Sequence, residues 1–340
     1  MKENTKKIIL HILKETGGFG IARRICRNIP RILMYHRIEY HSSWRGISGN
    51  IFEQQMKALR KGFNIISLGD LCNRVCNGDS IPSDTVVVTI DDGYEDFYIY
   101  AYPILKRYSV PATVYLTTDF VDQKIWLWPD VIDFILSRTK FSSYSLTRNG
   151  EVRQYKLSEG PGRREAWSQI GGYCLTLRDR ERKEFVRQLG DDLKVDIDPV
   201  PVPEYRGLTW DQVREMKKYG VDVGSHTSTH PRLVMVDQTN LFREIEGSRK
   251  RIQEELNEGV DSFCYPNGTR MDFDEKIKEM VRRAGYRSAT VGYWDPSGHI
   301  DLFELGRHGI GSDMFHFSKV IHGVENLSVL MRKKAWKFYS

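Results

Sequence analysis

The chain alternates between short apolar runs and longer segments in which apolar side chains recur every three or four residues. Residues 86–90 form the clearest run, because five β-branched residues stand together there, a pattern typical of a strand buried on both faces. The spacing of Phe52, Met56 and Leu59 instead predicts a helix that ends near Gly62. Strands that alternate with helices indicate a parallel sheet covered by helices. We expect further strands at 31–36, 63–66, 112–117, 221–225, 262–265 and 287–291, and further helices at 68–76, 96–107, 210–219 (with Thr209 as its N-cap), 241–256 and 273–284.

Residues 124–207 interrupt this alternation. The segment opens with Trp126 and Trp128, contains the charged run 178–187 and closes on a proline-rich stretch. A long insertion between two groups of polar residues is a candidate lid or substrate-specificity element. A helical insertion packed against the side of the domain fits the pattern equally well, and the two tryptophans favour core positions over sugar stacking.

Two acidic residues, Asp91 and Asp92, follow the strand at 86–90 and precede Gly93. Aspartate and glycine are ordinary turn residues, so these three residues alone predict no more than a turn. Adjacent carboxylates at the end of a buried strand repel each other, however, and a bound cation would remove that cost.

A pair of histidines offers further ligands for such a cation. His226 and His230 follow the predicted strand 221–225, and one helical turn would place both imidazoles on one face. Strand ends of one parallel sheet or barrel meet at the same edge, so the histidines can converge with the two aspartates. One carboxylate and two imidazoles form a catalytic zinc-type set that leaves a position open for water, and the second carboxylate is then free to act as a base.

These two motifs, in this order, resemble those of the polysaccharide deacetylases with a NodB homology domain. The resemblance covers roughly residues 31–123 and 207–312. It implies a distorted (β/α) barrel of about seven parallel strands, with the 124–207 segment as a helical insertion, whereas the alternation alone would also allow an open doubly wound sheet. The matching segments are 89–93 and 226–230, supported by 31–38, 110–116, 263–268 and 305–310.

The resemblance also implies a metal centre and an acid–base pair. Asp92, His226 and His230 would bind a divalent metal, usually Zn²⁺, with Co²⁺, Ni²⁺ or Mn²⁺ as alternatives. Asp91 would be the general base. A late histidine would be the general acid: His308 is the first candidate, and His316 and His322 are the alternatives.

Substrate contacts follow from the later motifs. The resemblance implies that the backbone near Asn267, flanked by Tyr265 and Pro266, stabilises an oxyanion, and that Leu305 lines a pocket for the acetyl methyl. Many family members carry an arginine in the third motif that holds the base, but residues 265–268 contain none, so the partner of Asp91 stays open. Two further candidate site residues are Arg307 and the strand-end residue His36, although a lone histidine is more often structural.

Positive charge gathers at the two ends of the chain. Residues 1–31 carry eight lysines and arginines against two glutamates, an excess equal to the net charge of +6 of the whole chain. We divide the chain into a basic amphipathic segment (1–30), a deacetylase-like domain (31–325) and a basic tail (326–340). Nucleic-acid binding is not expected, because no recognised motif accompanies the charge.

The amphipathic segment bears on location. Its apolar stripe, Ile8, Ile9, Ile12 and Leu13, either packs on the domain, the interpretation we favour, or contacts an anionic membrane. The segment is not a convincing signal peptide, and no apolar run approaches the roughly 20 residues that span a bilayer. Five cysteines without a paired spacing indicate reduced thiols. We therefore expect a cytoplasmic protein, with the inner face of the membrane as an alternative location.

The expected activity is metal-dependent removal of an N-acetyl group from a sugar of a polysaccharide or of a glycan precursor, which includes lipid-linked N-acetyl sugars. Three alternatives remain open: removal of a formyl group from a lipid-linked amino sugar, O-deacetylation, and carbohydrate binding without catalysis. The intact set of Asp91, Asp92, His226 and His230 argues against the last alternative.

Overall fold

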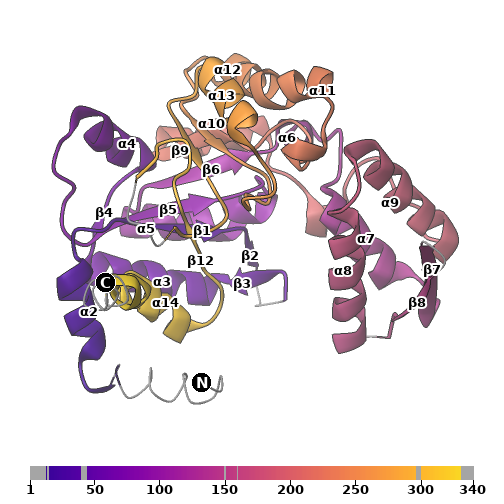
Figure 1. Cartoon of the computed structure of the whole chain (residues 1–340), viewed down its shortest axis with the longest axis horizontal. Helices are drawn as coiled ribbons and strands as arrows, with labels where there is room; N and C mark the ends of the chain where they lie inside the picture. The colour runs from indigo at the N-terminus through magenta and orange to yellow at the C-terminus, as the bar shows by residue number, and fades with distance from the viewer. Residues whose placement is uncertain are drawn as a thin grey trace, which may run out of the picture.

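The computed structural model describes residues 13, 15–39, 44–148, 151–158, 160–295 and 300–330. Its centre is a sheet of parallel strands, seven of which follow one another in the order β11-β10-β9-β6-β5-β1-β12, while β4 pairs with β5 (Figure 1). This arrangement confirms the predicted barrel-like fold over the open doubly wound alternative. The strands are β1 (Arg31–Tyr35), β4 (Asn64–Ile65), β5 (Thr85–Ile90), β6 (Ala112–Leu116), β9 (Val221–Ser225), β10 (Ser262–Cys264), β11 (Ser288–Thr290) and β12 (His308–Gly309).

The segment 305–310 brings the two ends of the curved sheet together. On one side Leu305 bridges Thr290 of β11, and on the other His308 and Gly309 pair with β1. Backbone hydrogen bonds support both contacts: the Leu305 amide donates to the Ala289 carbonyl at 2.9 Å, and the Ile310 amide donates to the Met34 carbonyl at 2.9 Å. A short segment therefore closes the barrel that the longer strands begin.

Alternation along the strands separates the barrel interior from the layer beneath the helices. In β5, Val86, Val88 and Ile90 belong to the large core between sheet and helices, whereas Val87 packs with interior residues such as Tyr115. Both sets are fully buried, which explains why the 85–90 run carries no charged side chain on either face. The next residue on the interior face beyond Thr89 is Asp91, so the strand itself aims this carboxylate into the barrel.

Helices cover the outside of the sheet. Two predicted helices, at 96–107 and 241–256, each contain a π-helical turn, Phe97–Ala101 and Arg243–Gly247. Thr209 caps its helix as predicted, since its hydroxyl accepts a hydrogen bond from the Gln212 amide. The α-helices of this layer are α2 (Gly18–Cys26), α3 (Gly49–Gly62), α4 (Leu68–Asn77), α5 (Tyr102–Tyr108), α6 (Thr118–Val121), α10 (Trp210–Lys218), α11 (Gln238–Phe242), α12 (Ser248–Leu256), α13 (Glu275–Arg283) and α14 (Met314–Ile321).

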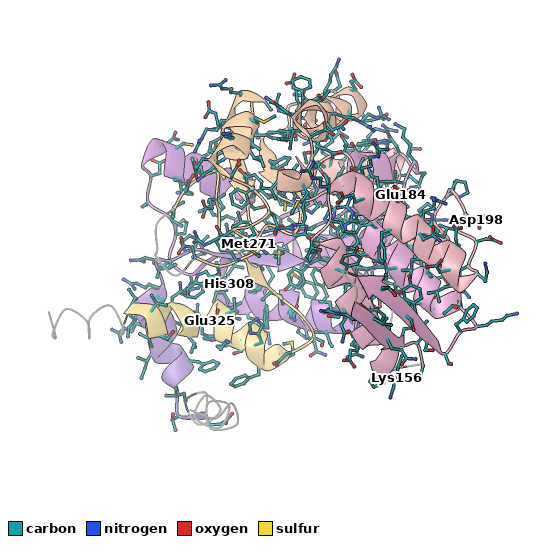
Figure 2. The ribbon with its side chains drawn as sticks, turned by 45° about the vertical axis from the view of Figure 1, so that its right-hand side comes forward. Lys156, Glu184, Asp198, Met271, His308 and Glu325 are labelled. Carbon is teal, nitrogen blue, oxygen red and sulfur yellow. The ribbon has the colours of Figure 1, made fainter. Side chains whose placement is uncertain are left out.

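The inserted segment forms a lobe beside the barrel with a core of its own. Figure 1 shows its helices and hairpin to one side of the sheet, and Figure 2 turns this lobe forward, marked by Lys156, Glu184 and Asp198. Its buried apolar residues, among them Ile135, Ile170 and Leu189, pack with one another and form a cluster separate from the barrel core. The elements are α7 (Trp128–Arg138), β7 (Ser143–Arg148), β8 (Glu151–Lys156), α8 (Pro161–Cys174) and α9 (Asp179–Leu193).

The predicted terminal segments fall largely outside the described residues. The apolar stripe at 8–13 is described only at Leu13, and the tail only as far as residue 330. Membrane contact through the basic termini and a cytoplasmic location therefore stay predictions. Within the described residues, no helix combines the length and apolar content that crossing a lipid bilayer requires.

The barrel interior predicts a sharp response to one added methyl group. A Cβ at Gly224 would lie 2.5 Å from the Tyr115 ring and 2.5 Å from the Ser262 hydroxyl. We expect Gly224→Ala to lower the free energy of unfolding by about 1–3 kcal/mol through overpacking, measured by urea denaturation. Gly172→Ala is the matched control, because nothing lies within 4 Å of that position on α8 and alanine favours helix. Equal stability of the two variants would contradict the packing described here.

Candidate active site

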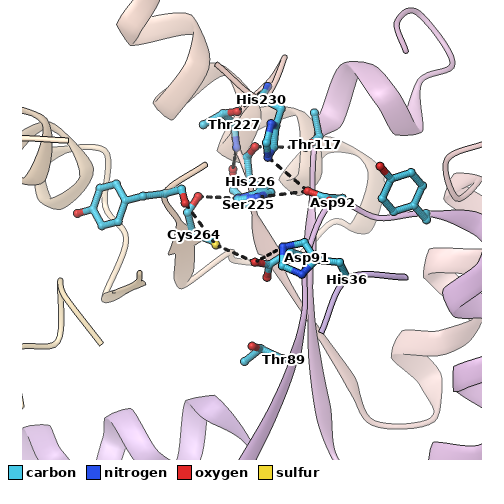
Figure 3. A network of polar contacts seen from close by, with 12 residues as sticks. His36, Thr89, Asp91, Asp92, Thr117, Ser225, His226, Thr227, His230 and Cys264 are labelled. Atoms are coloured by element: carbon cyan, nitrogen blue, oxygen red, sulfur yellow. Dashed lines mark hydrogen bonds and ion pairs between the residues drawn. The ribbon is translucent and has the colours of Figure 1, made fainter. Parts of the chain in front are cut away.

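The carboxyl ends of three strands bring the predicted ligands together. Asp91 and Asp92 follow β5, His226 follows β9, and His36 follows β1 (Figure 3). His226 Nε2 lies 3.5 Å from Asp92 Oδ1, and His230 Nε2 lies 3.4 Å from the same oxygen. All three side chains are buried, and their ligand atoms lie within 4.8 Å of one another. The structure thus converges Asp92, His226 and His230 on one point.

The histidines reach this point through an irregular loop, which corrects the predicted helical turn. Residues 226–230 form no helix, and Thr227 and His230 take left-handed backbone conformations with φ of 70° and 58°. Glu244 holds the loop: its carboxylate accepts hydrogen bonds from the Ser228 and Thr229 amides, each at 2.9 Å. The spacing of four residues therefore reflects a tight loop around a buried carboxylate, a residue that sequence reasoning missed.

The two imidazoles differ in their protonation. His226 Nδ1 lies 2.8 Å from the Cys264 carbonyl oxygen, which can only accept, so Nδ1 carries the hydrogen and Nε2 faces Asp92. Burial lowers the pKa of His230 to about 4, which keeps this imidazole neutral. Burial also lowers the pKa of His226, but Cys264 and Asp92 outweigh it and leave that pKa well above its ordinary value. Metal binding at His226 would therefore compete with a proton.

Arg307 clamps the neighbouring aspartate. Its guanidinium donates two hydrogen bonds to Asp91, to Oδ1 at 2.6 Å and to Oδ2 at 2.7 Å, and both side chains are buried. Burial alone would raise the pKa of Asp91, but the charge and hydrogen bonds of Arg307 bring it below its ordinary value. Arg307 thus occupies the place left open by the third motif, and Asp91 is held ionised with a fixed orientation.

The donor set favours one of two candidate ligand groups. Asp91, His226 and Cys264 also lie close enough to share an ion, but both oxygens of Asp91 already accept hydrogen bonds from Arg307. In contrast, Asp92 Oδ1 and His230 Nδ1 are buried without a hydrogen-bond partner in the described structure. An orphaned buried carboxylate oxygen between two imidazoles fits a divalent cation. We therefore assign the site to Asp92, His226 and His230.

An open cleft of about 400 Å³ lies over this group. Three histidines of the described chain line the cleft: His226, His230 and His36. His36 Nε2 lies 3.8 Å from Asp91 Oδ2, and the His36 side chain is 47% exposed. Asn267 also lines the cleft, in a left-handed conformation with φ of 56°. Tyr265 lines the cleft as well; its ring stacks on Phe273 and its hydroxyl donates to the Phe303 carbonyl, so these contacts fix its position. Pro266 is buried beside it.

The predicted general acid lies elsewhere. His308 follows Arg307 in the closing segment, and adjacent strand residues point to opposite faces. Its ring stacks on Trp294 and its Nδ1 lies 3.5 Å from Glu325, which Figure 2 labels with it, and His308 is not among the residues that line the cleft. The two alternatives are also bound elsewhere: His316 to the Gly309 carbonyl and His322 to the Ser318 carbonyl.

Leu305 is likewise not among the residues that line the cleft. It packs in the barrel interior with Ile32 and Tyr115 and borders a separate hollow of about 130 Å³ beside Trp294. Because the strand alternation that aims Arg307 at Asp91 also directs Leu305 inward, this residue is core. The structure does not place it where an acetyl methyl would lie.

Several cleft residues carry no signal in the sequence motifs. Asp130 accepts a hydrogen bond from the Tyr94 hydroxyl at 2.8 Å, and burial raises the pKa of Asp130 to about 7. Arg37 pairs with Asp96 at 2.8 Å and lies 4.4 Å over the Tyr94 ring. Arg37 falls within the matching segment 31–38 and could have been singled out there. Asp130 lies in the insertion, where no motif exists to find it.

The family follows from this site and from a direct match. The profile of the polysaccharide deacetylase family matches residues 79–289, which include both aspartates and both histidines. This match covers more than half of the chain, so the chain belongs to the polysaccharide deacetylase family.

Relatives with assigned names resemble parts of the chain. YxkH of Bacillus subtilis (strain 168), named a putative polysaccharide deacetylase, is 36% identical over 95 residues, which are 27% of this chain and 33% of that protein. The poly-beta-1,6-N-acetyl-D-glucosamine N-deacetylase of Escherichia coli (strain K12) is 25% identical over 131 residues, which are 37% of this chain and 19% of that protein. The chain therefore spans at most a third of the length of these relatives.

Solved structures share the fold over most of the chain. The Streptococcus pyogenes deacetylase PplD, in complex with acetate, aligns with a TM-score of 0.55 at 20% identity. The alignment covers 87% of this chain and 95% of the PplD chain. IcaB from Ammonifex degensii aligns with a TM-score of 0.56 at 18% identity, and this alignment covers 87% of this chain and 97% of the IcaB chain. At such low identity the likeness establishes the fold alone.

The Arg307 clamp predicts an unusually large loss of stability. Arg307→Ala would leave the buried Asp91 carboxylate without its cation, and we expect the free energy of unfolding to fall by about 3–5 kcal/mol in chemical denaturation. Arg187→Ala is the control, because Arg187 also pairs with one aspartate, Asp191, but is 65% exposed. That variant should lose less than about 1 kcal/mol. Similar losses in the two variants would contradict a clamp on a desolvated carboxylate.

Proposed function

We propose that the chain is a metal-dependent N-deacetylase of N-acetylated glycans. The observation that carries this proposal is the juxtaposition of two differently held aspartates. Asp92 presents an unpaired oxygen to two imidazoles, while Asp91, the next residue, is clamped by Arg307. One carboxylate is thus available as a ligand and the other as a base, the division of roles that hydrolysis of an amide requires.

The chain's own residues then divide the work of amide hydrolysis. A divalent ion such as Zn²⁺, held by Asp92, His226 and His230, would supply the Lewis acidity that polarises the acetyl carbonyl and acidifies a water. Asp91 accepts the proton of the attacking water, because Arg307 keeps its carboxylate ionised and fixed. Asn267 lines the same cleft, and its backbone amide would donate to the oxyanion.

His36 is the candidate general acid. Its imidazole lines the cleft, is half exposed and lies 3.8 Å from Asp91, so it can receive a proton near the base and pass it to the leaving nitrogen. An amine is a poor leaving group until it is protonated, and among the described histidines that line the cleft the other two are the proposed metal ligands. The role predicted for His308 therefore passes to His36.

The name of the Escherichia coli relative suggests the first substrates to test, polymers of N-acetylglucosamine. A formyl group on an amino sugar and an O-acetyl ester would meet the same machinery, so they remain alternatives to be tested with it. Carbohydrate binding without catalysis is disfavoured, because the described site retains both aspartates, both histidines and the clamp on the base.

Two neighbouring substitutions test the division between ligand and base. We expect purified wild type to bind a divalent metal stoichiometrically and to release acetate from N-acetylglucosamine oligomers. Asp92→Ala should lose both metal and acetate release, whereas Asp91→Asn should retain metal and lose activity by at least about 100-fold. Metal content by mass spectrometry and acetate release together check this. Failure of wild type to bind any divalent metal after reconstitution would overturn the proposal.

Comparing substrates with different leaving groups tests whether His36 acts as the general acid. His36→Gln should lower kcat for an N-acetyl amide by about 100-fold or more, because nothing then protonates the departing amine. An aryl acetate ester needs no such proton, so its hydrolysis should change little. His308→Gln is the matched control and should not show this amide-selective loss. Equal losses on amide and ester in His36→Gln would exclude an acid role for this residue.

A further inference from the structure

A second hollow adjoins the cleft and shares part of its wall. On the side of the inserted lobe, the cleft is lined by Trp44, Pro129 and Trp167. A hollow of about 580 Å³ begins at the same two tryptophans and continues along α8 over Arg164 and Gln169. The two hollows adjoin at the indole pair, and we call them together the groove.

The two indoles are held in place. Their ring centroids lie 4.8 Å apart, with an angle of 65° between the rings. The Trp167 indole N–H donates to the Pro129 carbonyl at 2.9 Å, which fixes this ring against the lobe. Beside Trp44, the Arg45 guanidinium lies 3.1 Å from Asp133 of α7 and ties the segment that carries Trp44 to the lobe. The pair is therefore a preformed surface, and ligand binding would not have to order it.

The surroundings of the pair fit a sugar ring. Trp44 is 39% exposed, so a large apolar face meets solvent at the mouth of the groove. Beyond it, the exposed face of α8 presents Arg164, Glu165 and Gln169, which offer both donors and acceptors. A pyranose has an apolar C–H face and a rim of hydroxyl groups, and it would match an aromatic platform bordered by polar side chains.

We propose that Trp44 and Trp167 form a subsite for a second sugar ring of the same glycan chain whose N-acetyl group reaches the metal centre. The proposal rests on the deacetylase function proposed above and narrows its substrate class. The occupant is another unit of the same glycan, because the hollow over α8 adjoins, at the two shared tryptophans, the cleft that would hold the reacting sugar. The substrate is accordingly an oligosaccharide or polysaccharide, and a single sugar on a lipid carrier would leave this subsite unused.

Dependence of activity on chain length tests the subsite. Wild type should show a kcat/KM that rises from N-acetylglucosamine to its tetramer. In Trp44→Ala the ratio of kcat/KM for the tetramer to that for the monosaccharide should fall by about 10-fold, since one aromatic platform is lost. Trp44 is the first choice because its exposure makes misfolding of the variant a small risk, and Trp167→Ala, checked by thermal unfolding, should repeat the effect.

An exposed aromatic residue of the same lobe provides the control. Phe141 is 49% exposed and is not among the residues that line either hollow. Phe141→Ala should leave the ratio at the wild-type value. An unchanged ratio in both tryptophan variants, or an equal fall in Phe141→Ala, overturns the subsite.

A binding measurement separates failure of this inference from failure of the proposed function. Isothermal titration calorimetry of Asp91→Asn with the tetramer measures binding without catalysis. The tetramer should bind at least about 10-fold more tightly to Asp91→Asn than to Asp91→Asn with Trp44→Ala. Tight binding that depends on Trp44, without acetate release by wild type, would keep the subsite and reject the deacetylase. If wild type releases acetate but the affinity for the tetramer does not change in Trp44→Ala, the deacetylase function stands and the subsite is rejected.

Discussion

The ion pair between Arg307 and Asp91 is the contact on which the site and the barrel both depend. It joins residues 216 positions apart, one at the end of β5 and the other in the short segment that closes the sheet. Either charge alone in this buried place would be costly, so each requires the other. The same contact therefore orients the base and joins the closing segment to the end of β5.

Strain in the backbone accompanies this arrangement. Asp92, Thr227, His230 and Asn267 all take left-handed conformations, which non-glycine residues rarely adopt, and all lie at or beside the cleft. The surrounding contacts hold them there: Glu244 binds the histidine loop through two amides, and the Thr227 hydroxyl accepts a hydrogen bond from the His230 amide at 3.0 Å. Such conformations persist only where the structure fixes them from several sides, which suits a site that must hold ligands before a metal arrives.

Sequence reasoning succeeded where one segment determines its own structure. The 85–90 run carries no charged side chain because it is buried on both faces, so strand and motif were evident together. It failed where distant segments meet. His308 was expected in the cleft, but which side of a two-residue strand faces the cleft depends on the closure of the barrel rather than on local pattern. Residues 226–230 form a loop rather than the helical turn that their spacing suggested, because Glu244, which lies later in the chain, accepts hydrogen bonds from two amides of this loop. No pattern within 124–207 showed which of its residues would face the cleft.

The division between barrel and lobe explains how chemistry and selectivity can vary separately. The ligands, the base and its clamp all come from the ends of barrel strands, whose order and register are fixed by hydrogen bonds. The lobe has its own apolar core and meets the cleft through a few side chains, among them Asp130, Asp133 and Trp167. Because the lobe's packing does not depend on the metal ligands, its cleft-facing residues can change without disturbing the hydrolytic centre. The proposed chemistry thus depends on the barrel, and the proposed selectivity for a glycan depends on the wall that the insertion builds beside it.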